Sequence, residues 1–368
     1  MTPPLRRLLS VVGARPNFMK LTPVANALAR RDGIQHVVVH TGQHYDAEMS
    51  DAFFSDLGLS RPDYNLEVGS ASHAQQTAAI MQRFEPVCLE VRPDLVLVYG
   101  DVNSTVAAAL VAAKLGVGVG HVEAGLRSRD WSMPEEINRV VTDRLSDLLF
   151  TPSRDAVDNL IAEGVPRERI HFVGNVMIDA LVRLLPAARA RNGRGRYGLD
   201  RRRYIMATLH RPANVDDPAT LHELLEALSE VSEDADVVFP VHPRTRERMR
   251  ALSWRSHSDR LLLLEPISYV EMLSLLLGSD LVITDSGGLQ EETTFLGIPC
   301  LTIRPNTERP ITCLHGTNRL VAPRREAIRQ AACESWRRPR QPSPQIERWE
   351  GRAAERIAAV LCDGARLD

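Results

Sequence analysis

Short apolar runs alternate with segments of helical pattern along most of this chain, and no other feature constrains the fold as much. The run 95–99, Leu-Val-Leu-Val-Tyr, is apolar at every position, which is typical of a strand buried on both faces of a parallel sheet. The first half of the chain is therefore predicted to be a doubly wound α/β domain. Its predicted strands are 8–13, 35–41, 94–99, 117–122 and 147–151, and its predicted helices are 20–31, 74–92, 105–115 and 134–145.

The alternation stops at 186–203, a segment rich in Arg, Gly and Ala that is the best candidate for a domain linker, and then resumes. A chain of 368 residues exceeds what one core usually supports, so we expect two Rossmann-like domains, with the carboxyl ends of their strands facing an interdomain cleft. A Pro-broken stretch precedes the last helix, which we expect to pack back on the N-terminal domain. The expected division is 1–185 with 346–368 for the first domain and 186–345 for the second, whose strands are predicted at 204–208, 237–241, 261–264, 281–284 and 300–303.

Composition excludes several classes of protein. The chain is 44% hydrophobic and 25% charged with a net charge of −2, which describes a soluble globular protein without the basic excess of a nucleic-acid or membrane partner. No apolar stretch approaches the length of a membrane span, and the N-terminal apolar run is too short for a signal peptide. The five cysteines are scattered, so we expect neither disulfides nor zinc, and a cytoplasmic location fits.

The segment 281–292 predicts a strand that feeds directly into a helix through Asp285-Ser286-Gly287-Gly288. Free amides and the helix dipole at such a helix start favour phosphate, and the glycines let an anion approach the backbone. Glu292 follows within the first turns, where a carboxylate can accept hydrogen bonds from sugar hydroxyls. A capped helix whose glycines only permit tight packing is the alternative, and on this motif alone the two are about equal.

Two basic residues follow the first predicted strand, Arg15 and Lys20. Lysine occurs only at positions 20 and 114, and every other basic residue is arginine. A lysine that persists against such a bias indicates a position where arginine will not serve, because lysine offers a compact ammonium with rotatable donors. Chance survival of Lys20 is the alternative.

Two carboxylates closely follow predicted strands, and a third lies at the start of the predicted helix 134–145. Asp101 is either a site residue or the N-cap of the following helix. Glu123, flanked by a histidine and an arginine, is hard to explain as core, so function is favoured over a structural ion pair. Glu135 fits an S-x-x-E capping box that begins at Ser132, and from the residues alone the capping interpretation prevails.

Two histidines, His210 and His242, end strands of the second predicted domain and either line a site or satisfy a turn. No H-E-x-x-H motif or Cys/His cluster indicates a metal, and no cofactor is expected. Acid/base groups on one domain and a diphosphate cradle on the other suggest proton chemistry on an activated sugar.

Nine motifs in unbroken order over roughly residues 8–325 resemble the non-hydrolysing UDP-N-acetylglucosamine 2-epimerase family. They are G-A-R-P-x3-K (13–20), G-Q-H (42–44), Y-G-D-x-N-S-T (99–105), H-V-E-A-G-L-R (121–127), P-E-E-I-N-R (134–139), L-H-R-P-x-N (209–214), P-V-H-P (240–243), D-S-G-G-x-Q-E-E (285–292) and T-E-R-P (307–310). The resemblance implies the two-domain GT-B fold and interconversion of UDP-GlcNAc and UDP-ManNAc through loss of UDP and a 2-acetamidoglucal. It also implies a cytoplasmic homodimer that acts on a UDP-sugar.

The resemblance further implies the site residues. The catalytic residues would be Asp101, Glu123, Glu135 and His210, and the substrate-binding residues Arg15, Lys20, Arg139, Met272, Ser286, Gly287, Gly288, Glu292 and Arg309. The first motif departs from the family's usual G-T-R-P-E at Ala14 and Asn17, which puts the local hydrogen bonding in question. A family subset has an allosteric substrate site near the Gln-His motif, but the segment 66–73 differs here, so no such site is predicted.

The alternatives left open are a hydrolysing epimerase that releases ManNAc and UDP, and an epimerase of a UDP-sugar carrying a C3 acetamido or a uronate group. A GT-B glycosyltransferase and a non-catalytic UDP-sugar sensor are less favoured.

Overall fold

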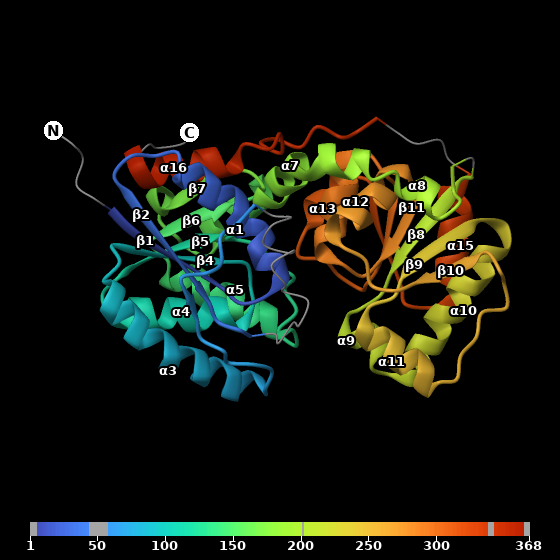
Figure 1. Ribbon diagram of the computed structural model, residues 1–368, viewed down its shortest axis with the longest axis horizontal. Helices are drawn as coiled ribbons and strands as arrows, with labels where there is room; N and C mark the ends of the chain where they lie inside the picture. The colour runs from blue at the N-terminus through green and yellow to red at the C-terminus, as the bar shows by residue number, and fades with distance from the viewer. Residues whose placement is uncertain (1–5, 44–57, 201, 338–341, 364–368) are drawn as a thin grey trace. The chain divides into compact units, whose positions relative to one another are not determined.

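The computed structural model describes residues 6–43, 58–200, 202–337 and 342–363, and the chain divides into two compact units. Unit 1 takes in the chain as far as Ala180 together with the C-terminal segment that begins at Glu347. Unit 2 is Leu181–Ile346. Each unit has its own parallel sheet (Figure 1).

Unit 1 contains a seven-stranded sheet in the order β3-β2-β1-β4-β5-β6-β7, and its strand pairs are parallel. The order reverses at β1, which lies between β2 and β4. Such a reversal opens a crevice at the carboxyl ends of the strands, so the loops after β1, β4 and β5 gather there. The strands are β1 Arg6–Val12, β2 Ile34–His40, β3 Tyr64–Asn65, β4 Leu95–Tyr99, β5 Gly118–Val122, β6 Leu148–Thr151 and β7 Ile170–Phe172.

Helices cover both faces of this sheet, as its apolar strands require. α3 packs against α4 and α4 against α5, whereas α1 packs against α16, and Figure 1 shows the two groups on opposite faces. The helices are α1 Arg15–Leu28, α3 His73–Val91, α4 Asn103–Lys114, α5 Pro134–Leu145, α6 Arg154–Ala162, the 3-10 turn η1 Arg167–Arg169 and α16 Ala353–Asp363. A further helix, α7 Val176–Ala190, begins in unit 1 and continues into unit 2.

The last helix, α16, belongs to unit 1, as the sequence predicted. The buried carboxylate of Asp179 accepts hydrogen bonds from the first amides of α16, Ala353 N at 3.1 Å and Ala354 N at 2.7 Å. The indole of Trp349 donates to the carbonyl oxygen of Pro152 at 2.9 Å. Burial raises the pKa of Asp179 to about 6, although the two amides lower it. The segment is therefore anchored by specific polar bonds as well as by its apolar face.

Unit 2 contains a six-stranded sheet in the order β10-β9-β8-β11-β12-β13, again with parallel pairs. β8 lies at the reversal, next to β11, so the loops after these two strands share one edge. The strands are β8 Tyr204–Thr208, β9 Asp236–Pro240, β10 Leu261–Leu264, β11 Leu281–Thr284, β12 Cys300–Ile303 and β13 Asn318–Val321. The helices are α8 Gly193–Arg196, α9 Pro212–Val215, α10 Pro218–Asp234, α11 Pro243–Ala251, α12 Tyr269–Gly278, α13 Gly287–Leu296, α14 Pro310–Leu314 and α15 Arg325–Trp336.

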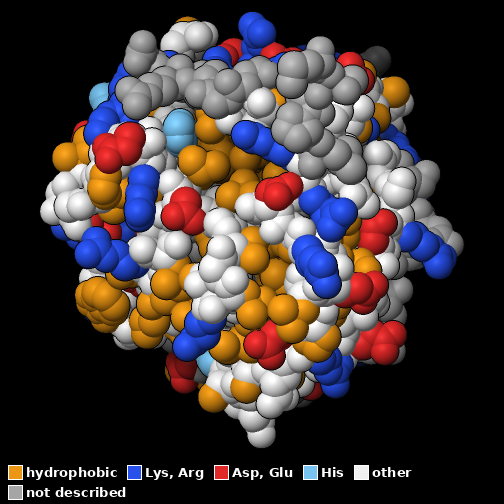
Figure 2. Space-filling view, turned by 90° about the vertical axis from the view of Figure 1, so that its left-hand side faces the viewer, with side chains coloured by type: hydrophobic (Ala, Val, Ile, Leu, Met, Phe, Trp, Pro, Cys, Tyr) orange, Lys and Arg blue, Asp and Glu red, His pale blue; other side chains and the backbone are white. Residues whose placement is uncertain are grey.

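In the space-filling view of Figure 2, acidic and basic side chains are interspersed, with hydrophobic side chains exposed in small groups between them. Among the described residues, no helix has both the length and the apolar character to cross a membrane. All five cysteines are free thiols.

Candidate active site

Lys20 and Glu123 form a buried ion pair at the carboxyl edge of the unit 1 sheet. Lys20 lies on α1, which follows β1, and Glu123 directly follows β5. Gly100, after β4, makes room for the pair: a Cβ on this residue would lie 2.7 Å from the ammonium nitrogen of Lys20. Gly100 also has a φ of 66°, which disfavours any larger residue. The structure thus brings together the loops of three neighbouring strands.

Ala14 and Asn17, the two departures from the family's usual first motif, take part in hydrogen bonds at this sheet edge. The amide of Ala14 donates to the side-chain oxygen of Asn17 at 3.1 Å. The side-chain nitrogen of Asn17 donates to the carbonyl oxygen of Tyr99 at 2.8 Å. Asn17 therefore ties the start of α1 to the end of β4. Arg15, the first residue of α1, is half-buried at the same edge.

Asp101 forms an ion pair with Arg139 of α5, and its side chain is 29% exposed. The alternative prediction, that Asp101 caps the next helix, is wrong because α4 begins at Asn103 with Val102 as its N-cap. The side-chain amide of Asn138 donates to the carbonyl oxygen of Asp101 at 2.9 Å. Two residues of α5 therefore hold the turn that carries Asp101.

Glu135 is exposed at the start of α5, and the capping-box prediction is wrong. Pro134 is the first residue of the helix, so the N-cap is Met133, whose side chain makes no capping bond. Ser132 lies one residue too early to cap and its hydroxyl donates to Asp130 at 2.6 Å. Glu135 is thereby left to face outward rather than back toward Ser132.

Glu136, which no sequence pattern indicated as a site residue, is the buried member of the Glu-Glu pair. Its carboxylate accepts from the backbone amides of Ser128 at 2.9 Å and Arg129 at 2.8 Å, and pairs with Arg139 at 2.7 Å. Burial would raise its pKa, but these donors lower it below the ordinary value. Glu136 thus shapes the loop before α5 and orients Arg139.

The backbone of Glu123 lies in the left-handed region, with a φ of 76°. A non-glycine residue pays for that conformation, and such strain concentrates at functional sites. The amides of Glu123 and Ala124 both donate to the carbonyl oxygen of Phe150 at 3.1 Å, which holds the turn. This observation supports the functional interpretation of Glu123.

In unit 2, the predicted phosphate cradle is the N-terminus of α13. Ser286 is its N-cap, and its hydroxyl accepts from the amide of Leu289. Gly287 and Gly288 are the first two helical residues. A Cβ at Gly287 would lie 2.7 Å from a guanidinium nitrogen of Arg309, so this arginine reaches the same helix end. A helix N-terminus next to a guanidinium is a site suited to anions.

Arg309 is buried and held by two carboxylates. It pairs with Glu291 at 2.8 Å and with Glu308. Glu308 also pairs with Arg304 at 2.6 Å and lies 3.6 Å from Arg211. Although burial alone would raise the pKa of Glu308, Arg309 and Arg304 hold it well below its ordinary value. The three arginines therefore share the ionised carboxylate of Glu308.

His210 follows β8 and pairs with Asp285, the residue before Ser286, with 2.9 Å between Nδ1 and Oδ1. The histidine side chain is 41% exposed whereas the aspartate is fully buried. Asp285 also accepts from the amides of His210 and Arg211 and from Asn214. Burial would raise the pKa of Asp285, but His210 and the amides lower it. Asp285 therefore fixes the ring of His210 through one nitrogen.

Glu292 is buried on α13 and accepts a hydrogen bond from the hydroxyl of Tyr269 at 2.9 Å. Burial raises the pKa of Glu292 to about 7. Tyr269 begins α12, which also carries the half-buried Met272.

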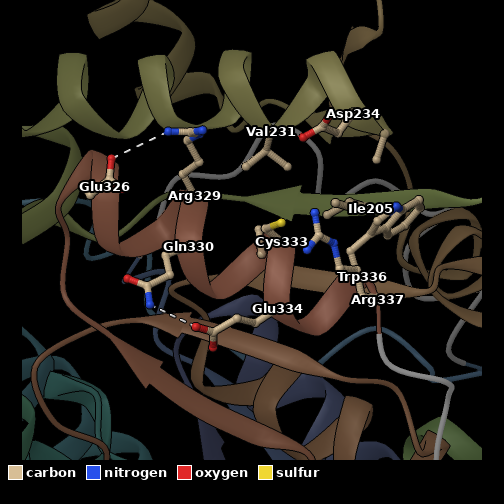
Figure 3. A pocket seen from close by; sticks show the side chains of 12 residues that line it. Ile205, Val231, Asp234, Glu326, Arg329, Gln330, Cys333, Glu334, Trp336 and Arg337 are labelled. Atoms are coloured by element: carbon tan, nitrogen blue, oxygen red, sulfur yellow. Dashed lines mark hydrogen bonds and ion pairs between the residues drawn. The ribbon is translucent and has the colours of Figure 1, made fainter.

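A separate pocket of about 490 Å³ lies between α10 and α15, near the amino ends of β8 and β9 (Figure 3). Ile205, Ala235, Cys333 and Trp336 are among its lining residues, and no predicted site residue lines it. It is therefore at the opposite end of the unit 2 sheet from His210 and Ser286. Among the described residues, no three His, Cys, Asp or Glu side chains gather in a way that could hold a metal ion.

Residues 26–362 match the family model for UDP-N-acetylglucosamine 2-epimerase. A UDP-N-acetylglucosamine 2-epimerase homolog of Methanococcus maripaludis is 44% identical over 327 residues, 88% of this chain and 90% of that protein. The UDP-2,3-diacetamido-2,3-dideoxy-D-glucuronate 2-epimerase of Pseudomonas aeruginosa is 44% identical over 360 residues, 96% and 99% of the two chains.

Among solved structures, that of the Methanocaldococcus jannaschii UDP-GlcNAc 2-epimerase in complex with UDP-GlcNAc and UDP matches with a TM-score of 0.90 and 40% identity, covering 97% of this chain and 100% of that one. The fold is therefore that of the GT-B class, as predicted, with two doubly wound α/β units. The chain belongs to the UDP-N-acetylglucosamine 2-epimerase family.

Proposed function

We propose that this protein interconverts UDP-N-acetylglucosamine and UDP-N-acetylmannosamine by inversion at sugar C2, without releasing free sugar. The observation that carries the proposal is the gathering of Glu123, Lys20, Asp101 and Arg139 at one sheet edge of unit 1. The family match and the anion-suited helix end of unit 2 support it.

The chemistry requires an excellent leaving group. The C2 proton has no carbonyl beside it and is weakly acidic, so departure of UDP must drive its removal. The C2–H and C1–O bonds break, a C1–C2 double bond forms, and UDP leaves with the C–O electron pair. Return of a proton to the other face of C2, with re-addition of UDP at C1, gives the epimer.

Two proton carriers are needed because the proton leaves one face of C2 and arrives on the other. Asp101, Glu123 and Glu135 are the proposed carboxylates, and Glu123 and Asp101 already have cations at their side. Lys20 offsets the charge of Glu123, and Arg139 does so for Asp101. Such fixed partners hold a general acid or base in place.

Unit 2 is proposed to hold UDP. Ser286, Gly287 and Gly288 would present the helix end to the diphosphate, with Arg309 as a further cation and His210 assisting departure of UDP. Glu292 would accept hydrogen bonds from the ribose hydroxyls, and Met272 and Arg15 would complete the binding residues. We also propose, from the family alone, a cytoplasmic homodimer that needs no metal or cofactor, and sedimentation of the purified protein tests the dimer.

A modified UDP-sugar is the second candidate substrate. The P. aeruginosa relative named for a 2,3-diacetamido glucuronate is as similar to this chain as the M. maripaludis homolog and spans more of it. Comparison of kcat/KM for UDP-GlcNAc and for the diacetamido uronate decides between them, because the preferred substrate gives the larger value.

Incubation with UDP-GlcNAc in heavy water, followed by NMR, tests the reaction. We expect deuterium at C2 in both epimers and a stable mixture of two UDP-sugars. Accumulation of free ManNAc with UDP would establish the hydrolysing alternative. Binding without exchange at C2 would identify a sensor, and transfer to an added acceptor sugar would identify a glycosyltransferase.

A further inference from the structure

Asp143, on α5, is a buried carboxylate that no part of the proposed reaction uses. Its side chain is 2% exposed. One oxygen lies 2.6 Å from Nδ1 of His121, and the other accepts from the amide of Gly125 at 3.0 Å and from Arg127 at 2.7 Å. These three partners lie on both sides of Glu123 along the chain. Asp143 therefore bonds to the turn before and after Glu123.

His121 carries the connection to a second strand end. Its Nε2 lies 2.8 Å from the carbonyl oxygen of Gly100, and because a carbonyl can only accept, Nε2 is the donor. Nδ1 faces the carboxylate of Asp143 at 2.6 Å. His121 therefore joins Asp143 to Gly100. Gly100 precedes Asp101 and leaves the space in which the ammonium group of Lys20 lies.

The network extends from Asp143 through Arg127 to a second carboxylate, Glu163, whose side chain is 40% exposed. Arg127 pairs with Asp143 and, through two bonds of 2.7 Å, with Glu163. Burial alone would raise the pKa of Asp143, but His121 and Arg127 lower it, so the carboxylate stays ionised. Such a network fixes the groups it joins, and loss of Asp143 would leave the buried guanidinium of Arg127 without one of its two carboxylates.

The strained backbone conformation of Glu123 has to be held in place by neighbouring groups. Its left-handed backbone lies between His121 and Gly125, both bound to Asp143, and the amides of Glu123 and Ala124 are bound to Phe150. The helix that carries Asp143, α5, also carries Glu135 and Arg139. α5 therefore carries Glu135 and the ion-pair partner of Asp101, and through Asp143 it holds residues on either side of Glu123 along the chain.

We propose that Asp143 is a positioning residue that sets Glu123 and Asp101 in their reactive places through Gly125, Arg127 and His121. This inference rests on the proposed function, since positioning matters only if these carboxylates act on the substrate. Asp143 itself is not a catalytic residue, because it touches only other protein groups in the network described.

The test compares Asp143→Ala and Asp143→Asn with the wild type in epimerisation and in UDP binding by calorimetry. Misplacement of a reacting group by about 1 Å costs roughly 100-fold in rate, so we expect Asp143→Ala to lower kcat by about that factor with KM and UDP affinity nearly unchanged. Asparagine keeps an acceptor oxygen for Gly125 and Arg127, and its amide nitrogen can donate to Nδ1 of His121 when that nitrogen carries no proton, so Asp143→Asn should recover about tenfold of the loss.

Asp179→Ala is the matched control. Asp179 is another buried aspartate of unit 1 that accepts two backbone amides, but it anchors α16. The control should lower the melting temperature and leave kcat at the wild-type value. A general loss of structure would lower activity in both alanine variants alike, whereas positioning lowers kcat only at Asp143.

Wild-type kcat in both Asp143 variants would overturn the inference while leaving the proposed function intact. If Asp143→Ala does not fold, the near-isosteric Asp143→Asn decides, because positioning predicts a lower kcat at a melting temperature close to wild type. Failure of the wild type itself to exchange the C2 proton would instead refute the proposed function.

Discussion

At the scale of single residues, Lys20 is a position where the identity of the side chain matters as well as its charge. Its compact ammonium lies against both Glu123 and the space left by Gly100. A guanidinium is wider and does not fit the same gap, so charge alone will not replace it.

We therefore predict that Lys20→Arg lowers kcat about 100-fold although the charge is kept, as expected for a displaced site group. Lys114→Arg is the control, because Lys114 is the other lysine and is exposed at the end of α4. Steady-state epimerisation assays measure both. Equal activity of the two variants would refute the argument from lysine scarcity.

Glu292 predicts a pH dependence of stability. Its pKa is raised by burial to about 7 from an ordinary 4.5, so between these values the folded protein keeps a proton that the unfolded chain has lost. The contribution of Glu292 to stability is thus greatest below pH 4.5 and is lost as the pH rises through 7. Urea unfolding at pH 5 and pH 8 should show a smaller difference for Glu292→Gln than for the wild type, and an unchanged difference would contradict this assignment.

Residue types at strand ends predicted the location of Lys20, Asp101, Glu123, His210 and Ser286 in the described structure, although their catalytic and binding roles stay predictions. The sequence did not single out Glu136, Asp143 or the pairing of Asp285 with His210. These carboxylates act through backbone amides and partners far along the chain, which local patterns do not reveal. The prediction of a capping box at Ser132 is wrong because the helix begins at Pro134, one residue later than that box requires.

At the scale of elements, continuous apolar runs identified the central strands, since strands buried on both faces carry a strong signal. The strands β3, β7 and β13 were missed because each has only two to four residues, some of them polar. Their pairing is set by the neighbouring strand rather than by their own sequence.

A bulky side chain at the N-terminus of α13 is expected to block UDP binding. Ser286→Trp places an indole where the proposed diphosphate would lie, so UDP affinity should fall at least about 100-fold by calorimetry, well beyond the loss of a single hydrogen bond. Ser335→Trp, a half-buried position on α15 of the same unit, is the control and should keep UDP binding. Unchanged affinity in Ser286→Trp would refute the placement of the cradle.

Two buried histidines of strand β2 are expected to make the stability of unit 1 sensitive to acid. Burial lowers the pKa of His36 and of His40 to about 4 from an ordinary 6.5. Below pH 6.5 the unfolded chain takes up protons that the folded unit does not, so their stabilising contribution is present above pH 6.5 and lost as the pH falls toward 4.

Melting curves from pH 7 to pH 4 measure this loss. His40→Asn should flatten the pH dependence, whereas the exposed His222→Asn should leave it as in the wild type. The same slope in all three proteins would exclude His40 as a cause.

At the scale of the whole molecule, the two units carry different parts of the proposed reaction. Glu123→Gln removes a proposed proton carrier and should lower kcat at least about 100-fold, while UDP binding, assigned to unit 2, stays at the wild-type value. Epimerisation and calorimetry on the same preparation measure the two. Joint loss of both would show that Glu123 supports binding or folding instead.

The attachment of α16 to Asp179 has a consequence for synthesis. The sheet of unit 1 is made before unit 2, but α16, which packs against α1, follows unit 2 in the chain and leaves the ribosome after it. The nascent amino-terminal half must therefore wait, with part of one face bare, until unit 2 has emerged in full. A chaperone that shields apolar surface has its longest opportunity to bind during that interval.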